Sequence, residues 1–152
     1  MTPAERADLV RRYREGYVAV VTAVAEHEDL DTAHEGWTPR QVVHHLADSE
    51  MTSAVRLRRL LAEDEPVIAG YDEEAFARTL RYEQRPVDAA LRALEAARAT
   101  TAELLDLLTE EDWMRRGTHT ESGPYGVEEW LRTYAAHAHD HAAQIRAARA
   151  PK

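Results

Sequence analysis

Residues 37–61 read WTPRQVVHHLADSEMTSAVRLRRLL, and they contain the clearest helix start in the chain. Thr38 offers the hydroxyl of a good N-cap, and Pro39 suits the first helical position because its missing N–H would be unpaired there. Gln41, three residues after the cap, completes a capping box. The pattern predicts a helix from Pro39 to about Leu61, with side-chain directions fixed from its first turn.

Three further long helices are predicted on either side of this one, because apolar residues recur at intervals of three and four. They run from about Pro3 to Glu28, from Pro86 to Leu108, and from Val127 to about Arg149. Short capped turns are expected at Asp72 and Thr109, where a side-chain oxygen precedes acidic, helix-forming residues.

Composition and element lengths predict an all-α fold. The chain is rich in alanine, leucine, arginine and glutamate, with only 6 glycines and 6 prolines. The stretch RRGTHTESGPYG, residues 115–126, is predicted to be a loop because glycines and a proline interrupt it. We expect a single-domain four-helix bundle over residues 1–152, in which the long connection between the second and third helices can carry a crossover.

The charge balance argues against nucleic acid as a partner. Against 19 basic residues stand 28 acidic ones, and the formal net charge of -9 would repel a phosphate backbone. No apolar run reaches the roughly 20 residues that a membrane span needs, and the first residues contain no signal-peptide core. We therefore expect a cytoplasmic protein that does not enter the membrane.

The segment YAAHAHDHAAQI, residues 134–145, places two histidines one helical turn apart. His137 and His141 share a helix face, so both imidazoles can bind one metal ion at about 2.0 to 2.1 Å. His139 points to nearly the opposite side. The chain has no cysteine, so such a site suits zinc, nickel, iron(II) or manganese. The alternative is that both are ordinary histidines with hydrogen-bond partners in the core or at the surface.

Candidates for a third ligand lie near the ordered start of the second predicted helix, where His44 and His45 are adjacent. They point about 100° apart, so only one of them can easily join a shared ion. His45 shares its face with Val42 and one-turn neighbours, and the facing favours it. Asp48 can accept the proton of its second ring nitrogen, or it can be a solvated carboxylate paired with an arginine.

Other candidates for the site have weaker patterns. Glu128 is a candidate base or substrate contact, although the helix dipole alone favours a glutamate in a first turn. Tyr134 lies one turn before the histidine pair and is a candidate substrate contact or a core tyrosine. His119, in the predicted loop, can approach the mouth of a site or be exposed. His27 and His34 show no partner pattern.

Two long stretches of the sequence together resemble a known family: GWTPRQVVHHLADSEMTSAVRLRRLLAEDEPVIAGYDEE, residues 36–74, and THTESGPYGVEEWLRTYAAHAHDHAAQI, residues 118–145. They are similar to the DinB-like superfamily and, more narrowly, to its YfiT group of metal-dependent hydrolases, which also includes bacillithiol transferases. The resemblance implies a four-helix bundle, a homodimer, and a divalent metal held by three histidines. On this chain these fall on His45, His137 and His141.

The resemblance also implies which metal ion and which reactions to expect. Family members often carry a further histidine beside the pair, where this chain has Asp140 and Gln144; these residues can tune the site or line its pocket. We expect one divalent ion, zinc or nickel before iron or manganese, acting on a small molecule. The open position can activate water for hydrolysis or bind a low-molecular-weight thiol for S-transfer. The alternative is a non-catalytic, metal-stabilised helical module that binds a ligand or a partner.

Overall fold

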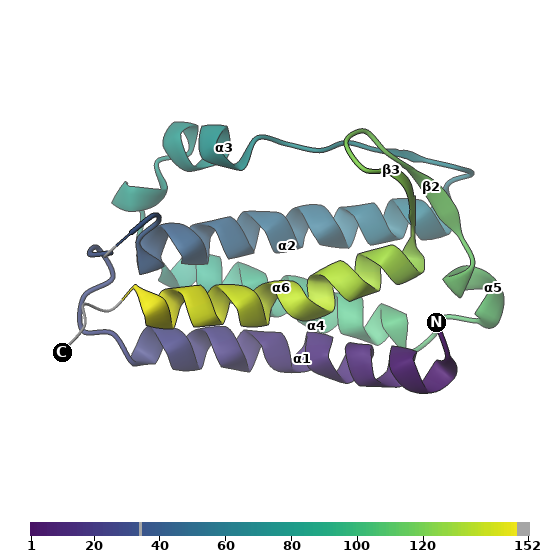
Figure 1. The fold of residues 1–152 in the computed structure, drawn as a ribbon, viewed down its shortest axis with the longest axis horizontal. Helices are drawn as coiled ribbons and strands as arrows, with labels where there is room; N and C mark the ends of the chain where they lie inside the picture. Colours follow the sequence, from purple (N-terminus) through teal and green to yellow (C-terminus); the bar gives the residue numbers. More distant parts are fainter. Residues whose placement is uncertain (34, 149–152) are drawn as a thin grey trace.

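Four long helices pack side by side in the computed structural model, which describes residues 1–33 and 35–148 (Figure 1). They are α1 (Pro3–Ala25), α2 (Pro39–Ala62), α4 (Asp88–Leu105) and α6 (Val127–Ala147). The predicted bundle is confirmed, and the helices differ from their predicted bounds by up to three residues. The predicted end of the last helix, Arg149, lies outside the described residues.

Side-chain caps define where several of the helices begin. The Thr38 hydroxyl accepts from the backbone N–H of Gln41, and the Gln41 side chain accepts from the N–H of Thr38. Thr109 caps the short helix α5 (Glu110–Trp113) in the same way, and Asp72 caps α3 (Glu73–Thr79). Both short turns were predicted at these residues, because a side-chain oxygen there can accept an otherwise unpaired N–H.

The long connection between α2 and α4 crosses back along the bundle. In Figure 1 the chain leaves the far end of α2, returns above it through α3, and enters α4 at the end where α2 began. Thus α2 and α4 run in the same direction. This returning segment also contains β1 (Val67–Ile68) and the 3-10 turn η1 (Tyr82–Gln84). The crossover that the length of the connection allowed is therefore present.

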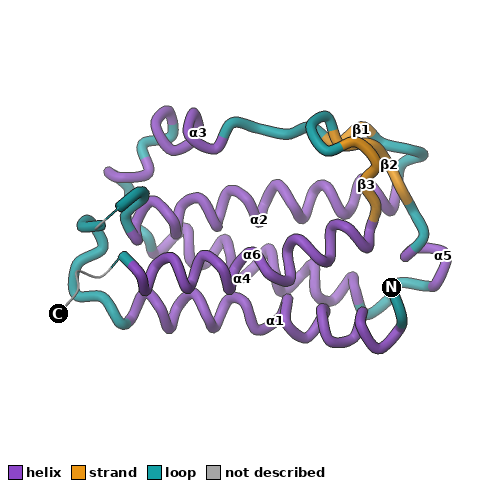
Figure 2. Tube along the Cα trace, in the orientation of Figure 1, coloured by secondary structure: helices purple, strands orange, loops and turns teal. Residues whose placement is uncertain are grey.

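A small sheet lies at one end of the bundle, so the expected all-α class is only approximate. β2 (Arg116–His119) pairs antiparallel with β3 (Gly123–Gly126) and parallel with β1 (Figure 2). The prediction of a loop at residues 115–126 was wrong over both strands. These strands are two to four residues long, too short to show an alternating apolar pattern.

Two glycines explain how this sheet forms. Gly123, the first residue of β3 after the hairpin turn, adopts a φ of 77°, a conformation that favours glycine. A Cβ at Gly117 would lie 2.3 Å from the carbonyl oxygen of Pro66. Glycine at position 117 therefore lets the chain before β1 approach β2 closely enough to pair.

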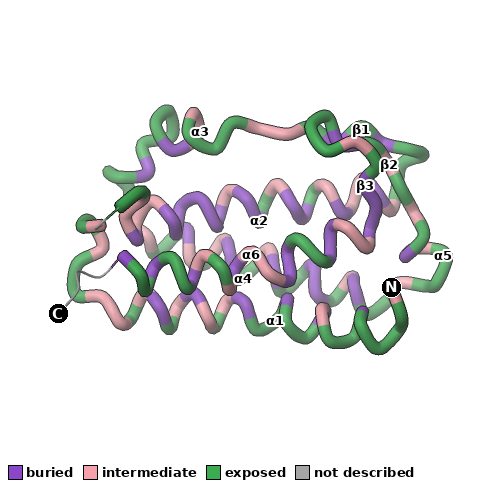
Figure 3. The backbone as a smooth tube through the Cα atoms, viewed as in Figure 1, coloured by how far each residue is buried: buried purple, intermediate pink, exposed green. Residues whose placement is uncertain are grey.

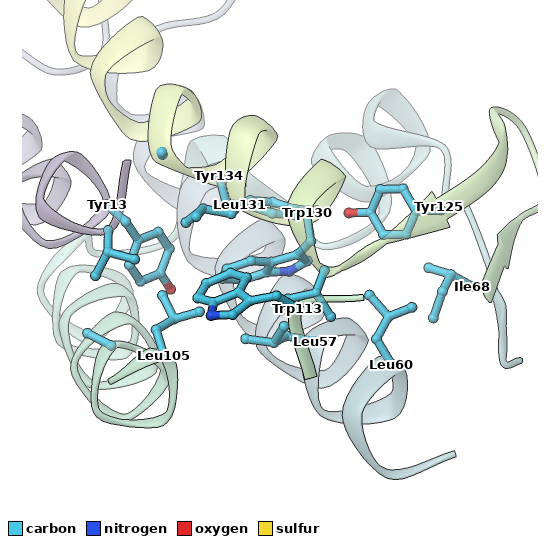
Figure 4. Close-up of a cluster of buried hydrophobic side chains, with 14 residues drawn as sticks. Tyr13, Leu57, Leu60, Ile68, Leu105, Trp113, Tyr125, Trp130, Leu131 and Tyr134 are labelled. Carbon is cyan, nitrogen blue, oxygen red and sulfur yellow. The ribbon is translucent and has the colours of Figure 1, made fainter. Parts of the chain in front are cut away.

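Buried positions recur along all four long helices (Figure 3), and the apolar core that they form has two clusters. The cluster near the sheet is rich in aromatic side chains (Figure 4), and the ring of Trp130 lies tilted against those of Tyr13 and Tyr134 at centroid distances of 5.4 and 5.2 Å. The second cluster surrounds the N-terminal half of α2 and the C-terminal half of α6. Among the described residues, the helices lack the length and apolar content needed to cross a membrane.

Candidate metal centre

Three imidazoles converge between α2 and α6. The Nε2 atom of His137 lies 3.3 Å from Nε2 of His45 and 3.1 Å from Nε2 of His141. One ligand atom from each histidine falls within 4.8 Å of the other two. The structure therefore brings together the three residues that helix facing and the family resemblance selected.

These separations fit a single divalent ion. Zinc binds imidazole nitrogen at about 2.0 to 2.1 Å, so the corners of a tetrahedral site lie about 3.3 Å apart. The two Nε2 to Nε2 distances of 3.3 and 3.1 Å are close to this value. The three side chains can thus hold a metal without a large rearrangement of either helix.

Burial keeps two of these histidines in the neutral form that a metal requires. It lowers the pKa of His45 to about 4, with a further contribution from His141. Burial also lowers the pKa of His137 to about 3, followed by the effects of His141, His45 and Arg98. Because an imidazole binds metal through an unprotonated nitrogen, both side chains are available as ligands at neutral pH.

Neighbouring side chains orient the imidazoles. The Nδ1 of His141 donates to the amide oxygen of Gln144 at 2.6 Å, which leaves its Nε2 free to face His137. Trp37 packs edge-on against His45, with ring centroids 5.2 Å apart. Gln144 was named from the sequence only as a departure from the family pattern; its spacing of three residues from His141 on one helix is a signal that could have indicated the contact.

Asp48 does not make the predicted contact with His45. Its carboxylate accepts a 2.6 Å hydrogen bond from the hydroxyl of Tyr82, and no hydrogen bond joins it to His45 in the described part of the chain. The expectation was wrong because Asp48 turns toward η1, a segment that the helical spacing does not reveal. Asp48 therefore links α2 to the returning connection.

The structure separates the two other candidate contacts. Glu128 lies nine residues before His137 on α6, about 13 Å along the helix axis, and pairs with the N-terminal amine and with Arg6. It is not brought to the centre. Tyr134, in contrast, lies beside the centre. Its ring centroid is 5.8 Å from that of His137, and its hydroxyl accepts a 3.0 Å hydrogen bond from Arg56.

Three further histidines in the described residues have partners away from the centre. His44 donates from Nε2 to the carbonyl of Arg85 and stacks on Tyr82, while His139 donates from Nε2 to the carbonyl of Arg12. His119 is buried on β2 and accepts at Nδ1 from a backbone N–H. None of these three belongs to the cluster of possible ligands that the described residues form. Of the two histidines without a partner pattern, His27 lies just after α1, and His34 lies outside the described residues.

The chain is similar to known proteins over most of its length. It matches the DinB superfamily over residues 5–145. A protein of Oceanobacillus iheyensis named "Putative metal-dependent hydrolase" is 39% identical over 121 residues, which cover 78% of this chain and 70% of that protein. A Bacillus cereus protein of the same name is 37% identical over 126 residues, covering 82% and 72%.

A solved structure shares the fold. It is described as YfiT from Bacillus subtilis, a probable metal-dependent hydrolase with an unusual four-helix bundle topology. It superposes with a TM-score of 0.89 at 31% identity, over 95% of this chain and 86% of its own. Taken with the match over residues 5–145, this likeness shows that the chain belongs to the DinB superfamily.

Proposed function

We propose that this protein is a divalent-metal-dependent hydrolase of a small molecule, with His45, His137 and His141 as the metal ligands. The observation that carries the proposal is the convergence of three imidazoles at separations suited to one ion. Zinc and nickel are the proposed ions, because imidazole suits both and the family resemblance favours them over iron and manganese.

The number of ligands supports a catalytic rather than a structural role. Structural zinc sites usually have four protein ligands, whereas catalytic sites have three and keep a position open. The cluster formed by the described residues stops at three histidines. A divalent ion in such a site lowers the pKa of bound water toward neutrality. A non-catalytic, metal-stabilised module would instead need a closed coordination shell.

The protein's own residues would prepare the site for this chemistry. Burial keeps His45 and His137 unprotonated, and Gln144 fixes the direction of the His141 ring. The relatives named as metal-dependent hydrolases support hydrolysis as the reaction class. Thiol S-transfer uses the same open position for a thiolate, and it is the outcome that the activity assay must distinguish.

Metal content tests the site assignment. We expect elemental analysis to find about one divalent ion per chain in the wild-type protein and almost none in His137→Ala, since two imidazoles make a much weaker site. His139→Ala is the matched control, because this residue lies on the same helix but bonds to the carbonyl of Arg12. Unchanged metal content in His137→Ala would exclude the proposed ligands.

Activity tests the reaction class. The metal-loaded protein is incubated with a panel of small esters, amides and electrophiles, with and without a low-molecular-weight thiol such as bacillithiol. Turnover without thiol supports hydrolysis. Turnover that requires thiol would show that the reaction is S-transfer and not hydrolysis. Metal binding without exchangeable water or turnover would favour the structural module. The homodimer and the cytoplasmic location stay predictions; sedimentation analysis checks the dimer.

A further inference from the structure

Tyr134, which contacts His137, is hydrogen-bonded to a positively charged group that has no carboxylate partner among the described residues. We define the Arg56 cluster as Arg56 of α2, Tyr134 of α6 and Tyr71 of the returning connection. Arg56 donates to the Tyr134 hydroxyl at 3.0 Å and to the carbonyl of Ala69, and its guanidinium lies 5.8 Å from the centroid of the Tyr71 ring. Three separate segments therefore converge on one cation.

The cluster retains hydrogen-bond donors that the protein does not use. The Nε of Arg56 and the hydroxyl of Tyr71 are buried, and neither has a hydrogen-bond partner among the residues described. The Tyr134 oxygen accepts from Arg56, so its own proton remains free to be donated. Burial raises the pKa of Tyr71 and of Tyr134, so both phenols stay protonated at neutral pH. Buried donors without acceptors are costly, and an anion would satisfy them.

Arg56 keeps its positive charge without a neighbouring carboxylate in ion-pair contact among the described residues. The formal net charge is -9, yet no carboxylate forms an ion pair with Arg56 in the parts of the chain that the structure describes. Glu73, at the exposed start of α3, is near enough to raise the pKa of both tyrosines but makes no such pair. One positive charge surrounded by neutral phenols suits a singly charged anion better than a dianion.

The two tyrosines of the cluster connect it to the three histidines. Tyr134 precedes His137 by about one turn of α6, and their rings are 5.8 Å apart. Ser49 follows His45 by one turn of α2 and approaches the Tyr71 hydroxyl closely enough to lower its pKa, short of hydrogen-bond geometry. One turn is about 5.4 Å, so a small molecule can reach from the imidazoles to the cluster.

Arg56 is also reachable from solvent. With Thr52, Ile68 and Ala69 it lines a cavity of about 430 Å³ between α2 and the segment around β1. This volume lies within the range of small-molecule sites, about 300 to 1,000 Å³. The cavity gives a ligand room beside the guanidinium.

We propose that the Arg56 cluster binds a carboxylate of the substrate while the reacting end of the same molecule lies at the three histidines. This inference rests on the proposed function and narrows the substrate class to small monocarboxylates. Arg56 and the hydroxyls of Tyr71 and Tyr134 are then specificity-determining groups. A carboxylate matches them because it carries one charge and accepts several hydrogen bonds.

Hydroxamates that bind zinc at one end test the proposal by binding alone. The probes are the monohydroxamates of succinic, glutaric and adipic acid, each compared with the compound that has a terminal carboxamide in place of the carboxylate. Calorimetric titration of the zinc-loaded protein measures each affinity. We expect at least one chain length to bind about tenfold or more tightly as the carboxylate, the size of a charge-assisted hydrogen bond.

Two variants and one control separate recognition from folding. Arg56→Gln should abolish the preference for carboxylate, whereas Arg58→Gln, which removes a charge that points toward α4, should keep it. Tyr71→Phe should reduce the preference several-fold without lowering the thermal midpoint, because the hydroxyl has no partner to lose in the described structure. A merely structural Tyr71 would leave the preference unchanged.

The outcomes distinguish this inference from the function on which it rests. Equal affinity of carboxylate and carboxamide at all three lengths, with zinc bound, overturns the inference alone. A preference that survives Arg56→Gln, or that Arg58→Gln removes equally, also overturns it. Failure of the wild-type protein to bind zinc overturns the proposed function, and the inference with it.

Discussion

Two groups of buried polar residues lie in the same bundle and differ in whether their polar atoms are paired within the protein. Glu50, Arg98 and Tyr13 form a network in which the carboxylate pairs with the guanidinium at 2.6 Å and also accepts from the Tyr13 hydroxyl. Arg98 donates further to the carbonyls of Tyr13 and Tyr134. Glu50 and Arg98 are only 1% and 2% exposed, yet their charges are matched within the protein.

The histidine centre is the opposite case. The three Nε2 atoms of its rings face one another, where a shared ion would satisfy them, while Nδ1 of His137, on the far edge of its ring, is buried without a hydrogen-bond partner in the structure described. Polar groups that satisfy one another stabilise a fold, whereas buried groups that lack protein partners leave capacity for a ligand. The comparison predicts that damage to the network lowers stability and damage to the centre lowers affinity for metal.

The largest effect is expected from breaking the buried ion pair. Glu50→Ala leaves the Arg98 guanidinium buried and uncompensated, which should lower the free energy of unfolding by about 3 to 5 kcal/mol. Urea denaturation measures the loss. Metal content, measured below the transition, should stay near that of the wild-type protein because no ligand is removed.

A double variant provides the control for this experiment. Glu50→Leu combined with Arg98→Met removes both charges, so it should recover much of the stability that Glu50→Ala loses. If Glu50→Ala instead kept its stability but lost metal, the network would belong to the site and the contrast would fail.

The stability of the metal-free protein should depend on pH through the histidine centre, and this prediction tests the second of the two groups. The pKa values of His45 and His137 are lowered to about 4 and about 3, below the ordinary value of about 6.5. The unfolded chain therefore takes up protons first as the pH falls. Stability should be unaffected above pH 7 and should decrease from about pH 6.5 toward pH 5, by about 2 kcal/mol for each of the two histidines.

Urea denaturation of chelator-treated protein at several pH values measures the slope of the unfolding free energy against pH. His44 contributes in the same direction, because burial lowers its pKa too. A double variant, His45→Ala with His137→Ala, isolates the centre and should flatten the slope, while His139→Ala should retain it. Equal slopes in both variants would show that the histidine centre does not carry the effect.

Gln144 offers a smaller change that acts through one ligand. Gln144→Leu removes the acceptor of the His141 Nδ1 proton, and loss of such a partner typically weakens metal affinity by about 10- to 100-fold. Competition with a chelator of known affinity measures the change. Gln144→Glu keeps an acceptor and should restore affinity. Equal affinities of the leucine and glutamate variants would exclude this role.

The convergence of the three histidines could be predicted because it depends on regular helices. Thr38 fixes where α2 begins, and from that point the direction of His45 follows from the helical period. His137 and His141 share a face by the same rule. Such reasoning works within an element and between two long helices that must bury their apolar faces together.

Contacts between a helix and a distant irregular segment could not be predicted in this way. Asp48 meets Tyr82 across 34 residues, and Glu128 meets the N-terminus across 127. No local period indicates which of several polar groups a flexible side chain will reach. The sheet was missed for a related reason, since β1 pairs with β2 through a close approach at Gly117 rather than through an apolar pattern.

The smallest effect is expected at Asp48. Its variants test whether this carboxylate contributes to stability or to metal binding. Asp48→Asn keeps an acceptor for Tyr82 but removes the charge, so the unfolding free energy should fall by only about 1 kcal/mol. Tyr82→Phe removes the same hydrogen bond from the other side and should cost a similar amount. Because no hydrogen bond joins Asp48 to His45 among the described residues, metal affinity in both variants should stay within about twofold of wild type. A tenfold loss of affinity in Asp48→Asn alone would place the carboxylate in the metal centre, since loss of a ligand's hydrogen-bond partner costs about that much.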